Sequence, residues 1–202
     1  GEVELWLPEL SELGGTTGPR AAMTVPEGIA ALSELLDRKL GNRPVTLAGI
    51  SLGGWLAARL AAARPERVAR LLLVVPGGYR DQDWQAIERM VRVSTYEDTR
   101  AAWRALFADP PWYLAPGRYL LFLAYSSRAV SAVLETVREQ DAFGDDELGR
   151  LDLPVGLIWG AEDKIIPAAQ AAGLPANVVV HVLPNVGHMP MMEAAAEVTK
   201  LI

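Results

Sequence analysis

The motif that most constrains this chain is Gly49-Ile50-Ser51-Leu52-Gly53, a G-x-S-x-G sequence between an apolar run and an Ala-rich helical stretch. A strand and a helix that meet in so sharp a turn need small residues beside the serine, and the turn lifts the hydroxyl clear of the sheet. The strained backbone at such a serine costs about 1–3 kcal/mol. The motif predicts Ser51 as a nucleophile and the Leu52 N–H as an oxyanion donor. The alternative is a Gly-rich strand–helix turn in which the serine has no catalytic role.

Short apolar runs alternate with helix-like stretches along the chain, which is typical of an α/β protein with a parallel sheet. The run from Val68 to Val75 is almost continuously apolar, as expected of a strand buried on both faces. The basic residues around its start are expected to form a solvated face (Arg64, Arg67 and Arg70). The other expected elements are strands at 3–7, 45–50, 155–159 and 178–183, a helix that begins at Val25, and helices at 52–63 and 191–202.

The window from Tyr79 to Phe143 has a different character, because it holds 11 of the 14 aromatic residues. Its periodicity is helical, and we interpret it as an insertion. We therefore divide the chain into a core part at 1–78, a helical cap at 79–149 and a second core part at 150–202, with the acidic stretch 141–147 as a solvated linker. Most of the aromatic side chains are expected to pack inside the insertion. Trp112 and Met189 are candidate substrate contacts, although helix packing explains Met189 equally well.

A nucleophilic serine needs a base, and the chain offers two histidines. His181 lies inside an apolar strand, where a structural role is expected. His188 follows a short loop after the last strand, and from such a loop a side chain can reach over the sheet. We therefore predict His188 as the base. The acid that orients the imidazole is predicted to be Asp163, just after strand 155–159, with the adjacent Glu162 as the alternative.

Composition removes several classes of function. Lys and Arg number 19 against 25 Asp and Glu, so the net charge of −6 argues against a nucleic-acid partner. The absence of cysteine excludes a disulfide scaffold, a thiolate nucleophile and Cys-ligated metal sites. The acidic start of the chain does not match a signal peptide, and no apolar run approaches the roughly 20 residues of a membrane span. We expect a soluble, cytoplasmic protein.

Taken together, these residues resemble the α/β-hydrolase superfamily, and the resemblance extends from Val3 to Ile202. The chain order of Ser51, Asp163 and His188 is that of the superfamily's catalytic triad. The other segments that carry the resemblance are 49–54, 64–75, 159–167 and 185–188. The stretches 106–112 and 199–202 are similar to the monoacylglycerol-lipase-like branch.

The resemblance also implies that the first strand of this chain is the family's fourth, so that the family's N-terminal strands are missing from it. The loop that supplies the family's second oxyanion N–H is not found here, and losing one such donor typically lowers turnover by about 10²–10³. In the family's sheet order, Val3–Leu7 and Val45–Ile50 would flank an empty slot. A missing N-terminal segment or a second chain would complete the sheet.

The fold implied is a mostly parallel sheet with helices on both faces and a helical cap. The function implied is a serine hydrolase that cleaves carboxylic esters with an apolar acyl group. Ser51 would attack the acyl carbon, His188 would carry the proton, and Asp163 would hold the imidazole tautomer. No cofactor or metal is needed. The alternatives are a C–C bond hydrolase or an acyltransferase with the same triad, and a catalytically silent fragment or binding module that lacks the oxyanion loop.

Overall fold

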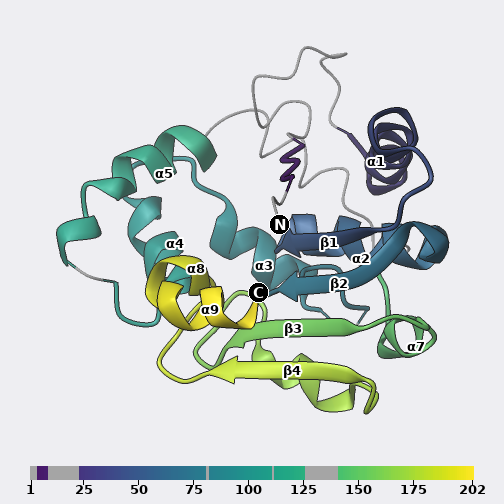
Figure 1. Ribbon diagram of the computed structural model, residues 1–202. Helices are drawn as coiled ribbons and strands as arrows, with labels where there is room; N and C mark the ends of the chain where they lie inside the picture. Colours follow the sequence, from purple (N-terminus) through teal and green to yellow (C-terminus); the bar gives the residue numbers. More distant parts are fainter. Residues whose placement is uncertain (1–3, 9–22, 81, 111, 126–140) are drawn as a thin grey trace.

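The computed structural model describes residues 4–8, 23–80, 82–110, 112–125 and 141–202. Within these residues the sheet has four strands, all parallel and ordered as in the sequence: β1 (Val45–Ile50), β2 (Val68–Val74), β3 (Val155–Gly160) and β4 (Val178–Leu183). Each lies within one residue of its expected bounds. The four arrows in Figure 1 point to the same side, so the carboxyl ends of all four strands meet at one edge of the sheet.

Two helices lie in the first half of the chain, and the first of them has clear start and stop signals. Helix α1 (Val25–Leu40) begins with a capping box between Thr24 and Glu27, and Gly41 ends it with a φ of +58°. Helix α2 (Leu52–Ala63) packs against β1 and β2, and α1 packs on α2. The short 3-10 helix η1 (Pro65–Arg67) then leads into β2.

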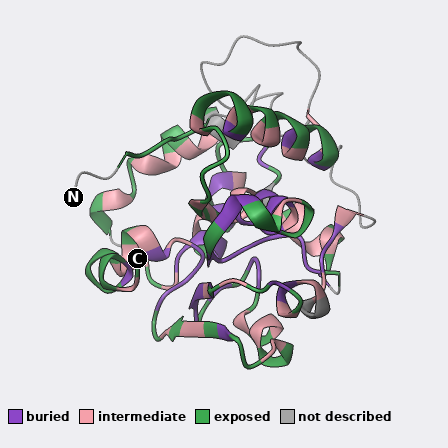
Figure 2. Cartoon of the chain, turned by 45° about the vertical axis from the view of Figure 1, so that its right-hand side comes forward, coloured by how far each residue is buried: buried purple, intermediate pink, exposed green. Residues whose placement is uncertain are grey.

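The hydrophobic core lies where the central strands meet α2. Figure 2 shows the buried residues concentrated there, whereas much of α1 faces solvent. Trp55 on α2 and Trp159 on β3 are almost fully buried. Their indole N–H groups donate to the backbone oxygens of Asp141 (2.9 Å) and Ile166 (2.7 Å), respectively. These bonds fix the loop before α7 and the loop after β3 against the core.

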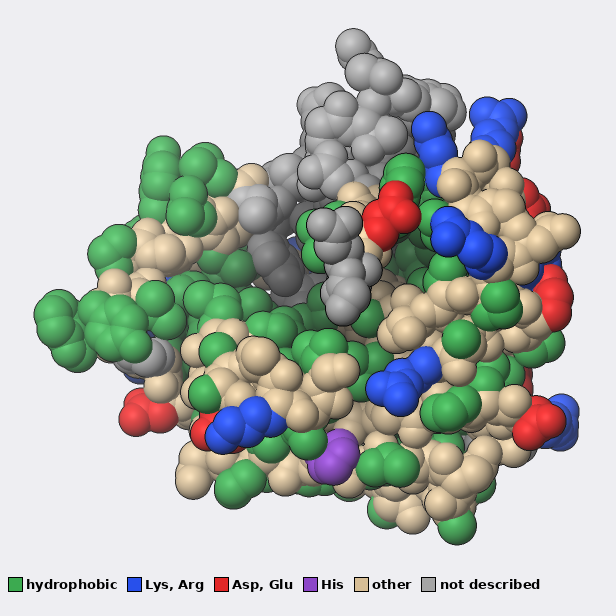
Figure 3. All heavy atoms as spheres, in the orientation of Figure 1, with side chains coloured by type: hydrophobic (Ala, Val, Ile, Leu, Met, Phe, Trp, Pro, Cys, Tyr) green, Lys and Arg blue, Asp and Glu red, His purple; other side chains and the backbone are tan. Residues whose placement is uncertain are grey.

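The segment between β2 and β3 is helical, as expected, in the parts that the structure describes. It contains α3 (Trp84–Val91), α4 (Asp98–Leu106), the 3-10 helix η2 (Trp112–Leu114) and α5 (Gly117–Tyr125). Residues 126–140 of the expected cap lie outside the described residues. In Figure 1, α4 and α5 lie beyond the carboxyl ends of the strands. Figure 3 shows hydrophobic side chains gathered over this region, and the large exposed ones on η2 and α5 are Trp112, Tyr113, Tyr119, Leu120 and Leu123.

The expected strand at 3–7 is wrong over its described part. Residues 4–8 have no regular structure, and Leu5 and Leu7 are 75% and 79% exposed. A strand is stable only when its backbone is paired and one face is buried. In the described part of the chain, β1 pairs only with β2, and residues 4–8 form no backbone pairing with either strand.

Three further expectations need correction. The acidic linker forms a short helix, α7 (Asp145–Gly149), and the Glu147 carboxylate pairs with Arg59 at 2.7 Å and Arg80 at 2.9 Å. Arg67 is only 3% exposed rather than solvated, because its guanidinium is bound by the Asp37 carboxylate and the Gly41 carbonyl at the end of α1.

The expected helix at 191–202 is two helices, α8 (Pro190–Glu193) and α9 (Ala195–Leu201). Ala194 separates them because its φ of −140° and ψ of 47° are not helical. Another 3-10 helix, η4 (Ala168–Gly173), precedes β4. Across the residues described, no helix has the length and apolar character that crossing a membrane requires.

Candidate active site

Ser51 stands at the turn between β1 and α2, in the strained conformation that the motif predicts. Its φ of +49° lies in the left-handed region, which a non-glycine residue adopts at a cost of about 1–3 kcal/mol. The surrounding backbone holds it there. The Ser51 N–H donates to Val74 O, while the N–H groups of Trp55 and Gly77 both donate to Ser51 O, each at 3.0 Å.

The glycines of the motif have unequal roles. A methyl group on Gly49 would lie 2.3 Å from the carbonyl oxygen of Gly53, so no side chain fits at this position. Gly54 is also tightly packed, since its added methyl would lie 3.0 Å from Pro76. By contrast, a methyl group on Gly53 would meet nothing within 4 Å. Close packing therefore requires Gly49 and favours Gly54, but it does not require Gly53, the second glycine of the motif.

The structure brings Ser51, His188 and Asp163 together at the carboxyl edge of the sheet. The His188 Nε2 is 3.1 Å from the Ser51 Oγ, and the His188 Nδ1 is 2.8 Å from the Asp163 Oδ2. His188 and Asp163 are both 5% exposed. A carboxylate at Nδ1 favours the tautomer whose Nδ1–H donates to it, and this leaves Nε2 free to accept the serine proton. The arrangement can thus activate the serine hydroxyl.

Asp163 rather than Glu162 faces the histidine. The other oxygen of Asp163, Oδ1, accepts the backbone N–H groups of Ile165 and Ile166, both at 2.9 Å. These bonds fix the carboxylate before any substrate arrives. Glu162 is exposed, and its backbone N–H donates to Val186 O. His181 pairs with Ile158 within the sheet, in the strand position expected for a structural residue.

Leu52 is the first residue of α2, and its N–H belongs to the first turn, whose donors have no intrahelical acceptor. It therefore remains the predicted oxyanion donor. Among the described residues, no three His, Asp or Glu side chains gather as metal ligands.

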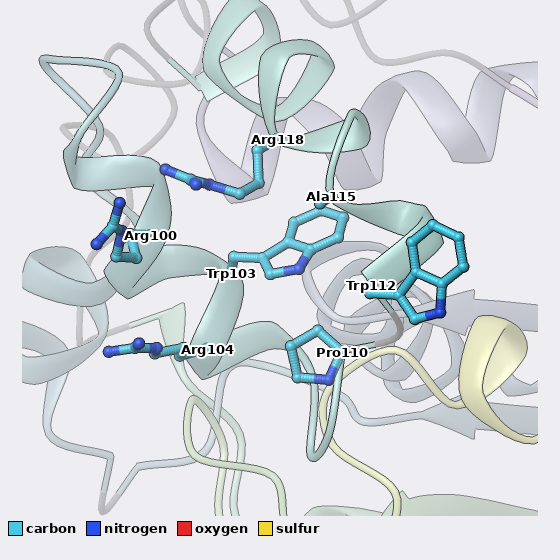
Figure 4. A pocket seen from close by; sticks show the side chains of 7 residues that line it. All are labelled: Arg100, Trp103, Arg104, Pro110, Trp112, Ala115 and Arg118. Carbon is cyan, nitrogen blue, oxygen red and sulfur yellow. The ribbon is translucent and has the colours of Figure 1, made fainter.

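Trp112 lines a pocket of about 270 Å³ between α4, η2 and α5. Figure 4 shows the indole of Trp103 at its centre, with Pro110 and Trp112 on one side and three guanidinium groups on the other (Arg100, Arg104 and Arg118). Met189, the other predicted contact, is partly buried and packs against the hydrophobic core. The pocket is therefore partly apolar and partly cationic.

Two polar residues near the three side chains were not singled out from the sequence. Lys164 Nζ donates to the carbonyl oxygens of Arg104 (3.0 Å) and Phe107 (3.4 Å), and Glu193 accepts N–H groups from Gly187 and Ala108. Each is a polar residue close in sequence to a predicted site residue. Their partners are backbone groups at the end of α4, in the residues after it and, for Glu193, also in the loop before His188, and no local sequence pattern reveals these contacts.

Comparison with known proteins finds one matching family and relatives that are named as enzymes or enzyme components. The family described as "Alpha/beta hydrolase family" matches residues 1–201. The dihydrolipoyllysine-residue acetyltransferase component of the acetoin cleaving system from Cupriavidus necator is 28% identical, and the match covers 100% of this chain and 60% of that protein. Monoacylglycerol lipase ABHD6 of Homo sapiens is 25% identical, with 81% of this chain and 55% of that protein covered.

Solved structures give the same result for the fold. A putative lipase from Acinetobacter baumannii superposes with a TM-score of 0.79 at 22% identity, covering 96% of this chain and 71% of that one. A meta-cleavage product hydrolase from Pseudomonas fluorescens gives 0.81 at 18% identity, covering 96% and 76%. The chain spans 60% or less of the length of the two curated relatives above.

Proposed function

Because the chain belongs to the α/β-hydrolase family, we propose that it is a serine hydrolase of carboxylic esters with an apolar acyl group. The observation that carries the proposal is the continuous chain of contacts from the Asp163 carboxylate through His188 to the Ser51 hydroxyl, at 2.8 and 3.1 Å. A serine held at φ +49° above a helix N-terminus is the second support.

The reaction proceeds through an acyl-enzyme. Ser51 Oγ attacks the acyl carbon while His188 Nε2 takes the hydroxyl proton, and the resulting imidazolium is stabilised by Asp163. The developing oxyanion accepts from the Leu52 N–H at the positive end of α2. When the bond to the alcohol breaks, His188 gives its proton to the alcohol oxygen. Water then attacks the acyl carbon while His188 takes its proton, and as the bond to Ser51 Oγ breaks His188 returns that proton to the serine, which releases the carboxylic acid.

The pocket at Trp112 supports an apolar substrate group. Trp103, Pro110 and Trp112 offer apolar walls, and burying each CH₂ of an acyl chain contributes about 0.8 kcal/mol. Helix α4, which supplies Trp103 to the pocket, also contacts the histidine loop, because Leu106 O at its end accepts the His188 backbone N–H at 2.8 Å. Trp112 is thus proposed to bind the substrate's apolar part.

Hydrolysis of a series of p-nitrophenyl esters, from acetate to octanoate, tests the assignment. We expect kcat/KM to rise with acyl length, and Ser51→Ala to abolish turnover while leaving the fold intact. Full activity in folded Ser51→Ala protein would sink the proposal. A folded wild-type protein without any activity would favour the catalytically silent alternative.

Trp112 has its own test with a matched control. Trp112→Ala should raise KM for the octanoate ester several-fold, since it removes one apolar wall, and change KM for the acetate ester little. Tyr113→Ala removes an adjacent aromatic ring that is 64% exposed and does not line the pocket. Equal effects of the two substitutions would contradict a role for Trp112 in binding.

One comparison favours testing a second acyl acceptor. The relative from Cupriavidus necator, whose match covers the whole of this chain, is named an acetyltransferase component. The same acyl-enzyme would serve a transferase if a thiol or an alcohol, rather than water, attacked it. Measuring the products with and without dihydrolipoamide distinguishes the two: a thioester product identifies a transferase, and free acid alone identifies a hydrolase.

A further inference from the structure

The end of helix α4 is attached to both loops that carry the candidate acid and base. Lys164, next to Asp163, donates from Nζ to the carbonyl oxygens of Arg104 and Phe107, and the backbone N–H of His188 donates to Leu106 O at 2.8 Å. The last carbonyls of a helix have no intrahelical partner. Here they are satisfied by residues of the candidate site, so the position of the helix end and the position of the loops depend on each other.

Glu193 adds a bridge between the same two parts. Its Oε1 accepts the N–H of Gly187, which directly precedes His188, and its Oε2 accepts the N–H of Ala108, two residues after α4, both at 2.8 Å. The non-helical backbone of Ala194, which separates α8 from α9, follows directly after this bridging residue. One side chain thus holds the histidine loop and the segment after α4 together.

The backbone segments around this bridge are closely packed. A methyl group on Gly187 would lie 2.7 Å from the backbone nitrogen of Ala108 and 2.9 Å from Leu106 O. On the other side, a methyl group on Gly160, at the end of β3, would lie 2.1 Å from Gly187 O. The loop before His188 is therefore enclosed between the end of the sheet and the segment after α4.

We propose that Glu193 is a positioning residue for His188: its carboxylate fixes the loop of Gly187 against Ala108 and so sets the approach of the imidazole to Ser51. Two acceptor oxygens are needed because both partners are N–H donors. Glu193→Gln keeps the size of the side chain but replaces one acceptor with an NH₂ group that faces a donor. One of the two bonds must then break, and the loop gains freedom immediately beside His188.

The kinetic part of the test rests on the proposed hydrolase function. Because small displacements of a catalytic group cost up to about 10²-fold, Glu193→Gln is expected to lower kcat for p-nitrophenyl butyrate about tenfold or more per titrated active site, with KM little changed. Glu197→Gln is the matched control. Glu197 is an exposed acid on α9, and its carboxylate makes no hydrogen bond to the residues that the structure describes. A purely structural role for Glu193 would lower thermal stability but leave kcat per titrated site unchanged.

A spectroscopic readout separates this proposal from the function itself. The proton between His188 Nδ1 and Asp163 Oδ2 should give a downfield ¹H NMR resonance, which Glu193→Gln should shift or broaden and Glu197→Gln should not. An unchanged resonance together with an unchanged kcat overturns the role of Glu193. If the wild-type protein shows no turnover at all, the hydrolase proposal fails, and the resonance alone decides whether Glu193 positions His188.

The wild-type protein provides a last check that does not depend on how the variant folds. The backbone amides of Gly187 and Ala108 should exchange their hydrogens slowly, because both are bonded to the Glu193 carboxylate. Exchange at the rate of an exposed loop would show that the bridge does not persist and would overturn the proposal.

Discussion

Replacing Asp163 with Asn tests the orientation of the imidazole. The carboxylate accepts three hydrogen bonds: Oδ1 takes the N–H groups of Ile165 and Ile166, and Oδ2 takes the Nδ1–H of His188. An amide has one acceptor oxygen. Keeping that oxygen on the two loop N–H groups preserves two bonds, whereas turning it toward His188 preserves one. The NH₂ group should therefore face His188.

The expected consequence is that His188 adopts the tautomer that cannot act as a base toward Ser51. An NH₂ donor at Nδ1 makes that nitrogen an acceptor and puts the proton on Nε2, which then cannot accept from Ser51. We expect kcat to fall about 10⁴-fold, as for this substitution in a serine protease triad. That factor corresponds to about 5.5 kcal/mol of activation free energy. The unfolding temperature should change little, because both loop bonds remain.

The assay is kcat on a p-nitrophenyl ester, with Glu162→Gln as the control. Glu162 is adjacent but exposed, and exposed substitutions usually change stability by no more than about 0.5 kcal/mol, so Glu162→Gln should leave both the fold and kcat almost unchanged. Retention of a tenth or more of the wild-type kcat in Asp163→Asn, or an equal loss of activity in the two variants, would show that Asp163 does not set the tautomer of His188.

Two predictions concern stability. Gly49→Ala should lower the free energy of unfolding by about 3 kcal/mol, because the methyl group overlaps backbone atoms, whereas Gly53→Ala should leave it unchanged or raise it by about 0.5 kcal/mol; equal effects in chemical denaturation would contradict this packing argument. Hydrogen bonds from Arg64 and Arg67 lower the pKa of Asp37 below its usual value. The stability from the Asp37 carboxylate is thus full above the unfolded-state pKa and is lost as pH falls through the lower folded-state pKa. Asp37→Asn should therefore destabilise the protein at neutral pH and lose that effect in acid; a difference from wild type that is independent of pH would contradict the pairing.

The sequence predicted those parts of the structure that depend on local pattern. The parallel strands follow from apolar runs between turn residues, and the strained Ser51 follows from its place between a strand and a helix. The positions of Asp163 and His188 could be predicted because each lies in the loop that follows a strand of a parallel sheet, and the carboxyl ends of such strands must meet at one edge. Their proximity to Ser51 is a consequence of topology.

The features that the sequence did not predict depend on contacts between distant segments. Arg67 lies close in sequence to Arg64 and Arg70, which favours a solvated position. The end of α1 nevertheless covers its side chain and supplies Asp37 as its partner. The mostly apolar stretch Val3–Leu7 predicts a strand, but residues 4–8 have no strand to pair with among the described residues. Glu193 looks like an ordinary helix acid, and its partners Gly187 and Ala108 become visible only once the end of α4 is placed against the histidine loop.

Labelling with a fluorophosphonate probe shows whether Ser51 is chemically activated, since the probe reacts only with a serine that is activated by its neighbours. We expect one covalent adduct on folded protein, located at Ser51 by mass spectrometry of the peptide, absent in Ser51→Ala and formed much more slowly in His188→Ala. A folded protein that takes up no probe, or that carries the adduct on another residue, would contradict the claim that Ser51, His188 and Asp163 form a working catalytic site.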